Sequence, residues 1–221
     1  MRKMLLFLLL SAFCGLTAKA QHMLAFNLSD VGNDSLTIEL LDKNSFHDVV
    51  KRERVKATNG QFFYDLKTDV ARNIRVCSRT GCLNAWVVPG EQGVVTGTMK
   101  KHVWTGTEFY TELEKVEKAK TPFLEQMQQM CDDVNNKKMT DKEAYAQMDI
   151  IDAKMDSVNL AYITKHPDSG LSVVLCGTSS KPMEKLNMIN PKTIIGPFSN
   201  YAMMLAADDF YAKMREKASK E

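Results

Sequence analysis

Apolar and polar positions alternate in short runs through the N-terminal half of the chain. Leu24, Phe26 and Leu28 alternate with polar or small residues, and the same pattern returns at 36–40, 62–66 and 74–76. An alternation of period two is typical of strands that bury one face. Turn residues separate the runs, for example at 31–34 and 89–91. We therefore expect seven or eight short antiparallel strands between 23 and 104, arranged as a β-sandwich or a partly closed barrel.

One turn signal also predicts which strands pair. Asn59-Gly60 stands between the runs 49–57 and 61–66. Asn-Gly favours the two-residue turns of β-hairpins, because both residues accept a positive φ. The sequence therefore predicts that these two runs pair with one another as a hairpin.

After Thr105 the apolar positions are spaced three and four apart, which is the period of a helix. Pro122 lies inside this stretch and predicts a kink or a new helix start, because proline lacks the amide that a helix interior needs. Polar residues at 135–138 end the segment. The predicted buried stripe is Leu113, Val116, Lys120, Phe123, Met127, Met130 and Val134.

A second helix is expected directly afterwards. Thr140 and Glu143 have the spacing of a capping box, and His166-Pro167 ends the pattern. Two stripes joined by a short polar turn predict a long antiparallel helical hairpin at about 107–165. C-terminal helices are expected at about 169–217. The last of these would be capped by Ser199, and its expected buried positions are Tyr201, Leu205, Phe210 and Met214. The fold class is thus α+β, with an antiparallel β domain at 21–105 and a helical region at 106–221.

The first twenty residues have the layout of a secretory signal peptide. Arg2 and Lys3 precede an apolar run from 4 to 16, and Ala18-Lys19-Ala20 supplies small residues at the two positions that a signal peptidase reads. The apolar run is too short to span a membrane. We expect cleavage after Ala20 and a mature chain that is secreted, periplasmic or associated with the cell envelope, without a transmembrane segment. Phe13 precedes Cys14 where a lipobox needs a small residue, so no lipid anchor is expected.

Removing the signal changes the charge balance. The whole chain has 29 basic and 27 acidic residues, and the signal carries Arg2, Lys3 and Lys19, which leaves 26 basic and 27 acidic residues. A nearly neutral chain has no overall attraction to nucleic acid or to an anionic membrane surface. We therefore expect no nucleic-acid partner.

Four cysteines remain after cleavage. Cys77 and Cys82 flank four residues that end in Gly81, which predicts a hairpin loop between two strands. The pair is compatible with a disulfide staple, with two separate thiols, or with a redox pair for which Arg79 supplies the local positive charge. Cys131 and Cys176 are expected to be buried core residues.

The other chemistry-bearing residues indicate structural roles. The four histidines, His22, His47, His102 and His166, have no metal-ligand spacing, and the methionines of the helices fall on the predicted seam. The basic run 51–56 is typical of a charged edge strand. The segment 178–181 comes near a Ser-x-x-Lys motif but has threonine at the nucleophile position, so a loop is expected. No catalytic residue, cofactor site or metal site is predicted.

Several short motifs occur in a specific order. Gly60-Gln61-Phe62 is followed by 87–91 (VVPGE), then by Gly106-Thr107 before a long helix, and then by 162–169 (YITKHPDS) at the end of the second helix. This order resembles the uncharacterised N-terminal domain that precedes the thioredoxin module in some periplasmic thiol–disulfide proteins of the TlpA/ResA type. The resemblance covers about residues 23–215. It implies an exported β-rich domain followed by helices, with no established activity of its own.

The chain departs from those relatives in one respect. Their thioredoxin domain carries a Trp-Cys-x-x-Cys site, whereas this sequence has no Cys-x-x-Cys, and neither Trp86 nor Trp104 has a neighbouring cysteine. The leading hypothesis is therefore an exported, non-catalytic envelope module that binds or scaffolds a protein or ligand partner. The alternative is a redox accessory that works with a separate thioredoxin-like protein through Cys77 and Cys82, and an unrecognised hydrolase is a third hypothesis. The partner's identity, the oligomeric state, and whether the helical hairpin packs on its own chain stay open.

Overall fold

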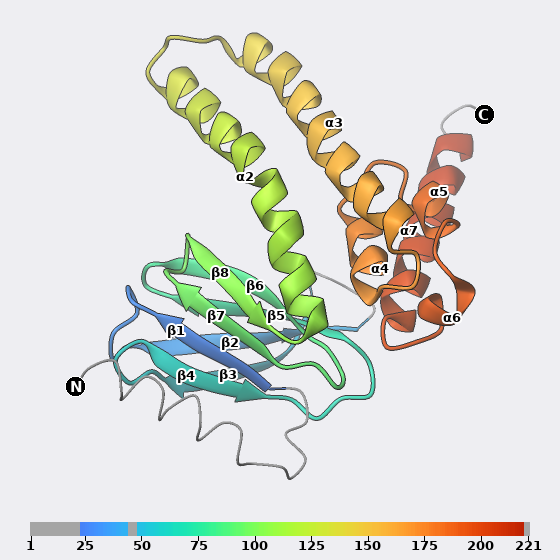
Figure 1. The fold of residues 1–221 in the computed structure, drawn as a ribbon. Helices are drawn as coiled ribbons and strands as arrows, with labels where there is room; N and C mark the ends of the chain where they lie inside the picture. Colours follow the sequence, from blue (N-terminus) through green and yellow to red (C-terminus); the bar gives the residue numbers. More distant parts are fainter. Residues whose placement is uncertain (1–22, 44–47, 219–221) are drawn as a thin grey trace.

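The computed structural model describes residues 23–43 and 48–218, shown as a ribbon in Figure 1. The predicted signal peptide with its cleavage site after Ala20, and the histidines His22 and His47, lie outside the described residues.

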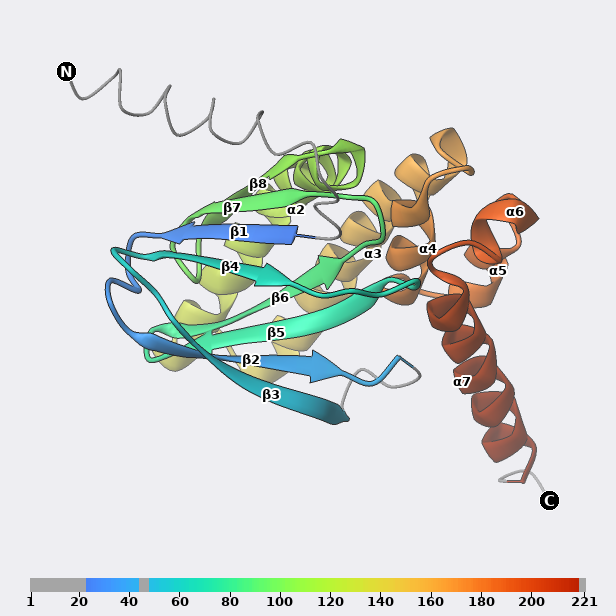
Figure 2. The same ribbon diagram turned by 90° about the horizontal axis from the view of Figure 1, so that it is seen from below.

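Within the described residues, eight strands come first and form two four-stranded sheets with the orders β4-β1-β7-β8 and β3-β2-β5-β6. The strands are β1 (Met23–Leu28), β2 (Ser35–Leu41), β3 (Val49–Lys56), β4 (Gln61–Asp65), β5 (Arg72–Ser78), β6 (Gly81–Val87), β7 (Gly93–Gly97) and β8 (His102–Gly106). The two sheets lie face to face and do not close into a barrel (Figure 2). Alternate residues such as Leu36, Ile38 and Val76 are buried between them. The expected number of strands and the alternation of buried positions are confirmed.

The expectation of purely antiparallel pairing was wrong at one place. β1 and β7 are parallel, with Leu24 opposite Gly93 and Leu28 opposite Gly97. Five strands separate β1 from β7 along the chain, and four of them, β2, β3, β5 and β6, form the other sheet. No tight turn joins β1 to β7, so nothing local fixes their relative direction.

The Asn59-Gly60 hairpin prediction was also wrong, although the turn itself is present. Asn59 and Gly60 both have positive φ, and Thr58 and Gln61 exchange backbone hydrogen bonds of 2.9 and 3.0 Å across the turn. The flanking strands then separate into different sheets, because β3 pairs with β2 and β4 pairs with β1. A Cβ on Gly60 would lie 2.3 Å from the carbonyl oxygen of Leu28, so the turn packs tightly against the end of β1. This contact directs the chain from one sheet to the other.

Six helices are described after the strands: α2 (Glu108–Asn135), α3 (Asp141–Lys165), α4 (Gly170–Gly177), α5 (Pro182–Leu186), α6 (Pro191–Ile194) and α7 (Ser199–Ala218). The capping box at the start of α3 is confirmed, since the Thr140 hydroxyl accepts from the Glu143 amide and the Glu143 carboxylate accepts from the Thr140 amide. A kink or a new helix start was expected at Pro122; α2 contains Pro122 within one helix, so no new helix begins there. No helix of the described residues is long and apolar enough to span a bilayer.

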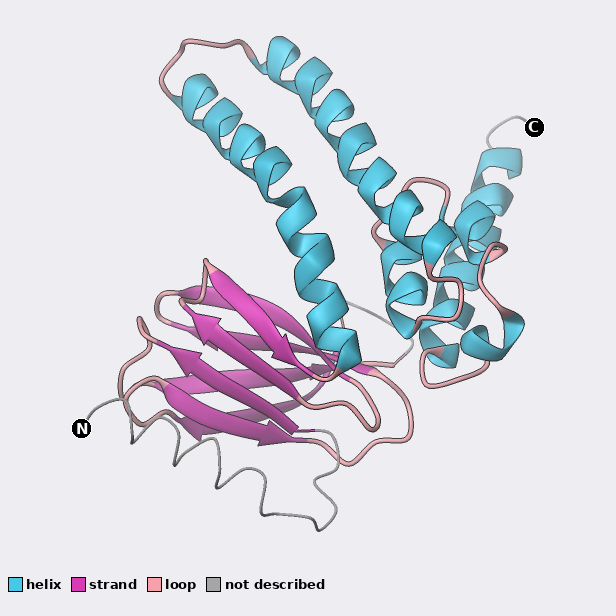
Figure 3. Cartoon of the chain, in the orientation of Figure 1, coloured by secondary structure: helices cyan, strands magenta, loops and turns pink. Residues whose placement is uncertain are grey.

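The helices lie to one side of the sheets (Figure 3). α2 begins between the edge strands β8 and β6, where the buried Tyr110 stacks on Trp104 and donates a 2.7 Å hydrogen bond to the Trp86 carbonyl. α3 leads back to the α4–α7 group, in which residues 171–176 of α4 are buried. The end of α7 extends away from the other helices in Figures 1 and 2, so Phe210 and Met214, expected to be buried, are exposed.

Candidate binding groove

A groove of about 720 Å³ lies between β8 and α2. One wall comes from the β7–β8 turn and from β8 itself, and the other comes from the side of α2 that is turned away from α3. The lining residues are Lys100, Lys101, His102, Val103, Trp104, Glu117, Thr121, Leu124, Glu125, Gln128, Gln129 and Asp132.

The end of the groove nearest the start of α2 is fixed by contacts between this helix and β8. The Trp104 amide donates a 2.7 Å hydrogen bond to Oε2 of Glu114. β8 is an edge strand, and this amide is satisfied by the helix rather than by a neighbouring strand. A Cβ on Gly106 would lie 2.1 Å from the Gln92 carbonyl oxygen, and Gly106 has a φ of +134°, so only glycine fits at this junction. The base of α2 is therefore held against β8, and the groove opens along the helix beyond Glu114.

The entry of α2 is capped by a residue from a distant loop. Thr107 occupies the N-cap position, and its hydroxyl accepts from the Gln92 amide at 2.9 Å. The Glu91 carboxylate accepts from the Phe109 amide at 3.2 Å and also contacts the Thr107 hydroxyl. A carboxylate at this position satisfies an amide that has no partner within the helix and interacts favourably with the helix dipole.

The two walls of the groove differ in charge. Lys100 and Lys101 lie on the strand side, whereas Glu117, Glu125 and Asp132 lie on the helix side. The floor includes the apolar side chain of Val103. Such a site suits a partner that offers both donors and acceptors together with some apolar surface.

His102 adds a polar atom that the fold does not use. Its ring packs edge-on against Trp104, and its Nδ1 is buried without a hydrogen-bond partner among the described residues. A buried polar atom of this kind costs free energy unless something bonds to it. Sequence reasoning could not group His102 with α2, because the spacing between a strand residue and a helix residue about twenty positions away carries no structural signal.

The structure joins Cys77 and Cys82 as a disulfide at the tip of the β5–β6 hairpin. The two residues lie directly opposite one another in register, with Cα atoms 4.1 Å apart. Cys82 is exposed and Cys77 is half-buried. Arg79 in the turn forms two hydrogen bonds of 2.9 Å with the Asp34 carboxylate, so its charge is directed toward the β1–β2 turn.

The two remaining described cysteines have different environments. Cys176 is buried as predicted, and burial raises the pKa of its thiol to about 12. Cys131 is exposed, so the prediction of a buried core residue was wrong. Cys131 lies on the outer part of α2, where α3 covers only one side of the helix. No group of three or more His, Cys, Asp or Glu side chains with metal-binding geometry occurs within residues 23–43 and 48–218.

An ion pair between a buried lysine and a partly buried carboxylate was missed by sequence reasoning. Lys185 of α5 forms a 2.9 Å contact with the Asp156 carboxylate of α3, and the Ser180 hydroxyl and amide also donate to Asp156. Burial raises the pKa of Asp156, but the hydrogen bonds from Ser180 and Lys185 outweigh it and hold the pKa below its ordinary value. The predicted loop at 178–181 is thus fixed to α3. Its partner Asp156 lies 24 positions earlier than Ser180, which no local motif could indicate.

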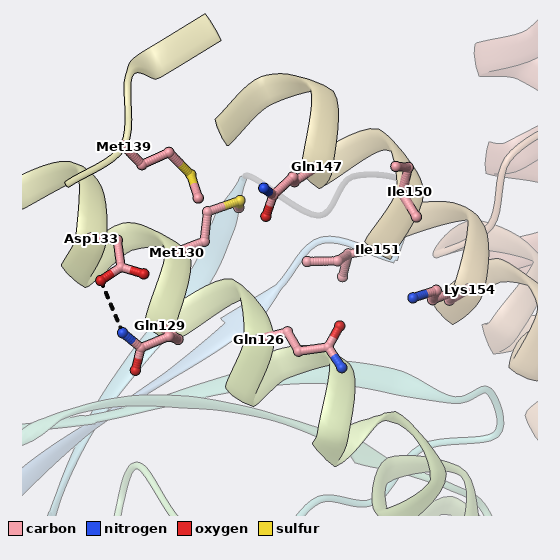
Figure 4. A pocket seen from close by; sticks show the side chains of 9 residues that line it. All are labelled: Gln126, Gln129, Met130, Asp133, Met139, Gln147, Ile150, Ile151 and Lys154. Atoms are coloured by element: carbon pink, nitrogen blue, oxygen red, sulfur yellow. Dashed lines mark hydrogen bonds between the residues drawn. The ribbon is translucent and has the colours of Figure 1, made fainter. Parts of the chain in front are cut away.

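Two smaller cavities flank the contact between the outer parts of α2 and α3. One of about 280 Å³ is shown in Figure 4, where Met130 of α2 and Ile151 of α3 face each other across the gap. The other, of about 290 Å³, lies on the opposite side of Met130. The contact between these helices is therefore narrow.

No family model, no curated protein and no solved structure matches this chain.

Proposed function

We propose that this chain is an exported, non-catalytic module of the cell envelope that binds a protein or ligand partner in the groove between α2 and β8. The observation that carries the proposal is the groove itself. Its volume of about 720 Å³ falls within the usual range of binding pockets, and its walls combine lysines, carboxylates and apolar side chains.

The surroundings of the groove support this function. The end nearest the start of α2 is held by the Glu114–Trp104 hydrogen bond and by the stacking of Tyr110 on Trp104, so this part of the groove is formed before a partner arrives. Preformed sites lose less conformational entropy on binding. The unused Nδ1 of His102 offers a further polar contact.

Location and family enter the proposal from the sequence alone. The signal-like residues 1–20 support export, and the ordered motifs support membership among the N-terminal domains of TlpA/ResA-type proteins. We further propose that the two sheets form a β-sandwich and that α2 and α3 act as one helical hairpin. Export is tested by cell fractionation and N-terminal sequencing, for which we expect a mature start at Gln21. A full-length cytoplasmic product would contradict it.

The groove is tested by site-specific photo-crosslinking in the native envelope. A benzoylphenylalanine at Val103, 41% exposed on β8 in the groove, should give discrete adducts. The matched control replaces Val50, 52% exposed on β3 of the other sheet. The variant Leu124→Arg should abolish the Val103 adducts by filling the groove. Adducts of equal yield at both positions, or adducts that are unaffected by Leu124→Arg, would contradict the assignment.

A second candidate function is supported by the disulfide at the β5–β6 tip. In this role the reduced pair would donate two electrons to a partner disulfide. The Cys82 thiolate attacks one partner sulfur and releases the other as a thiol, and Cys77 then attacks Cys82, releasing the second partner thiol and closing the Cys77–Cys82 bond. Exposure of Cys82 makes it the attacking residue.

The trap variant for this role is Cys77→Ser, which leaves the exposed Cys82 without its resolving thiol. It should accumulate a mixed disulfide that reductant releases, whereas Cys82→Ser, which keeps the half-buried Cys77, should accumulate much less. Absence of a mixed disulfide in both variants would reject the redox role and leave the disulfide as a structural staple.

A further inference from the structure

The groove between β8 and α2 runs along the open edge of a sheet. β8 is the last strand in the order β4-β1-β7-β8, and it lies beside α2 in Figure 1. His102 and Trp104 lie on one face of this strand and Val103 lies on the other, because side chains alternate along a strand. All three line the groove. A cavity that contacts both faces of a strand lies along its edge, so the backbone of β8 is itself part of the wall.

The hydrogen bonds around β8 show which backbone groups face this edge. The Thr98 amide donates to the Lys101 carbonyl at 2.8 Å across the β7–β8 turn, whereas the Trp104 amide donates away from β7, to Glu114. In an antiparallel pair, positions that bond to the neighbouring strand alternate with positions that do not. The odd-numbered residues of β8 therefore bond to β7, and the amides and carbonyls of His102 and Trp104 point outward.

Glu114 occupies only one of these outward groups. Its carboxylate accepts from the Trp104 amide, which closes the edge at the end nearest the start of α2. The Trp104 carbonyl and both backbone groups of His102 are left beyond this point. No strand in residues 23–43 and 48–218 pairs with this side of β8. Outward amides and carbonyls at alternate residues are the groups that an added strand uses.

The side chains beside the open edge also lack partners. Lys100 and Lys101 are exposed at the β7–β8 turn, Glu125 is exposed on the α2 wall, and none of the three forms an ion pair with another described residue. The Nδ1 of His102 is buried without a hydrogen bond. An occupant that brings an acidic group to the turn and a basic group to α2 would complement both walls.

We propose that the occupant of the groove is an extended peptide segment of a partner protein, which adds to β8 as a further strand. This inference rests on the proposed binding function. Main-chain hydrogen bonds hold such a segment, and its alternate side chains supply specificity. The α2 wall from Glu117 to Asp132 is roughly 22 Å long at about 1.5 Å per residue. This length matches about six or seven residues of extended chain. Acidic side chains of the segment face Lys100 and Lys101, and a basic side chain faces Glu125.

Fluorescence anisotropy with a labelled peptide tests the inference. The probe has about seven residues of alternating threonine and valine, with lysine near one end and glutamate near the other. Both orders of the charged residues are used, because an edge strand accepts a parallel or an antiparallel neighbour. Since few hydrogen bonds form, binding is weak, and the mature chain is titrated to about 1 mM. We expect saturable binding of one order.

N-methylation of the probe separates strand addition from other modes of binding. In an extended chain every second amide faces the neighbouring strand. Methylation of that alternating set should weaken binding at least about tenfold, and methylation of the other set should change it by less than about twofold. This measurement needs no change in the protein.

A pair of variants at one position tests the same point from the protein side. His102→Pro removes the outward amide but spares the bonds to β7, because an edge strand tolerates proline where its N–H faces outward. It should weaken probe binding at least about tenfold. His102→Ala keeps the amide and removes only the ring, so it should weaken binding by a smaller factor. Circular dichroism spectra of both variants should match that of the unmodified protein.

Failure of this inference differs from failure of the proposed function. Absence of photo-adducts at Val103 contradicts the binding function itself. Strand addition alone is overturned if those adducts form and depend on Leu124 but neither probe order binds by about 1 mM. It is also overturned if the two methylated sets bind equally, or if His102→Pro, with its fold intact, binds as well as His102→Ala. Each of these results would leave the groove to an occupant without an extended backbone, such as a polysaccharide.

Discussion

Replacement of Lys120 by methionine should stabilise this protein. Lys120 lies on the buried side of α2, where its side chain is 11% exposed. Its nearest carboxylate is Glu117, 3.9 Å away from the ammonium, and that side chain is 44% exposed. Methionine has a similar length and a similar helix propensity, so Lys120→Met removes the charge while it retains most of the packing.

The magnitude follows from two opposing contributions. Burying one ion costs several kcal/mol after relaxation. A pair about 4 Å apart gains roughly 1 kcal/mol in water and about 4 kcal/mol at an effective dielectric constant of 20, and the exposure of Glu117 favours the lower figure. We therefore expect Lys120→Met to raise the free energy of unfolding by about 1–2 kcal/mol at pH 7.

The same reasoning fixes the pH dependence. Burial lowers the pKa of Lys120, and the nearby Glu117 only partly opposes this shift. In the unfolded chain lysine has a pKa of about 10.4. Between the folded and the unfolded pKa the unfolded state binds more protons, so wild-type stability rises with pH through this window. The advantage of Lys120→Met should therefore be full at neutral pH and should shrink as the pH approaches about 10.

Urea unfolding followed by circular dichroism at pH 7 and near pH 10 measures both effects. The control is Lys118→Met, whose side chain is 70% exposed and whose 3.6 Å pair with Glu114 lies on the surface. It should change the stability by less than about 0.5 kcal/mol. If Lys120→Met lowered the free energy of unfolding by about 1 kcal/mol or more at neutral pH, the ammonium would be well paired in the native state, and the reasoning from burial would be refuted.

Three further substitutions test other features of the fold by the same urea assay. Asp156→Ala should cost about 3 kcal/mol, because it leaves the buried Lys185 unpaired. Since the pKa of Asp156 is held low, the stability that the ionised carboxylate contributes should be present at neutral pH and lost as the pH falls below about 4. If Asp156→Ala lowered the free energy of unfolding by less than about 1 kcal/mol at pH 7, this expectation would be contradicted. Gly177→Ala should cost about 2 kcal/mol or more, because its Cβ would lie 1.8 Å from the Tyr201 hydroxyl, and an unchanged midpoint would contradict this close approach. Pro122→Ala should add about 1–3 kcal/mol to the free energy of unfolding by restoring a helix hydrogen bond at an exposed position, and an unchanged or lower urea midpoint would contradict this expectation.

Features that depend on neighbouring residues were predictable from the sequence. The capping box at Thr140 needs only a residue three positions later, and strand alternation needs only every second position. The short helix α5, which lies within the range 169–217 where C-terminal helices were expected, begins with proline at its first position, where the missing amide has no cost. Such signals act over a few residues, and the tertiary structure has little reason to override them.

Pairing between distant segments was not predictable in the same way. Asn59 and Gly60 form the expected turn, but β4 pairs with β1, where the ring of Phe62 stacks on that of Phe26 with 4.5 Å between the ring centroids. The groove also depends on contacts between segments that the local sequence pattern does not connect. Trp104 and Glu114 are ten residues apart, and their hydrogen bond depends on the direction in which α2 leaves the edge of the sheet.

The most instructive errors concern burial along α2, because one stripe of apolar residues was expected to fill one seam. The first part of α2 packs between β6 and β8, and Tyr110 and Val116 are buried there. Beyond Pro122 the helix has α3 on one side only, so Cys131, near the predicted seam, is exposed. A three-and-four spacing shows which side of a helix is apolar but not what covers it. The exposure of Cys131 and the groove on the far side of the same helix therefore have one origin, because α2 is longer than the structure that packs against it. Partner binding in the groove would cover part of that excess.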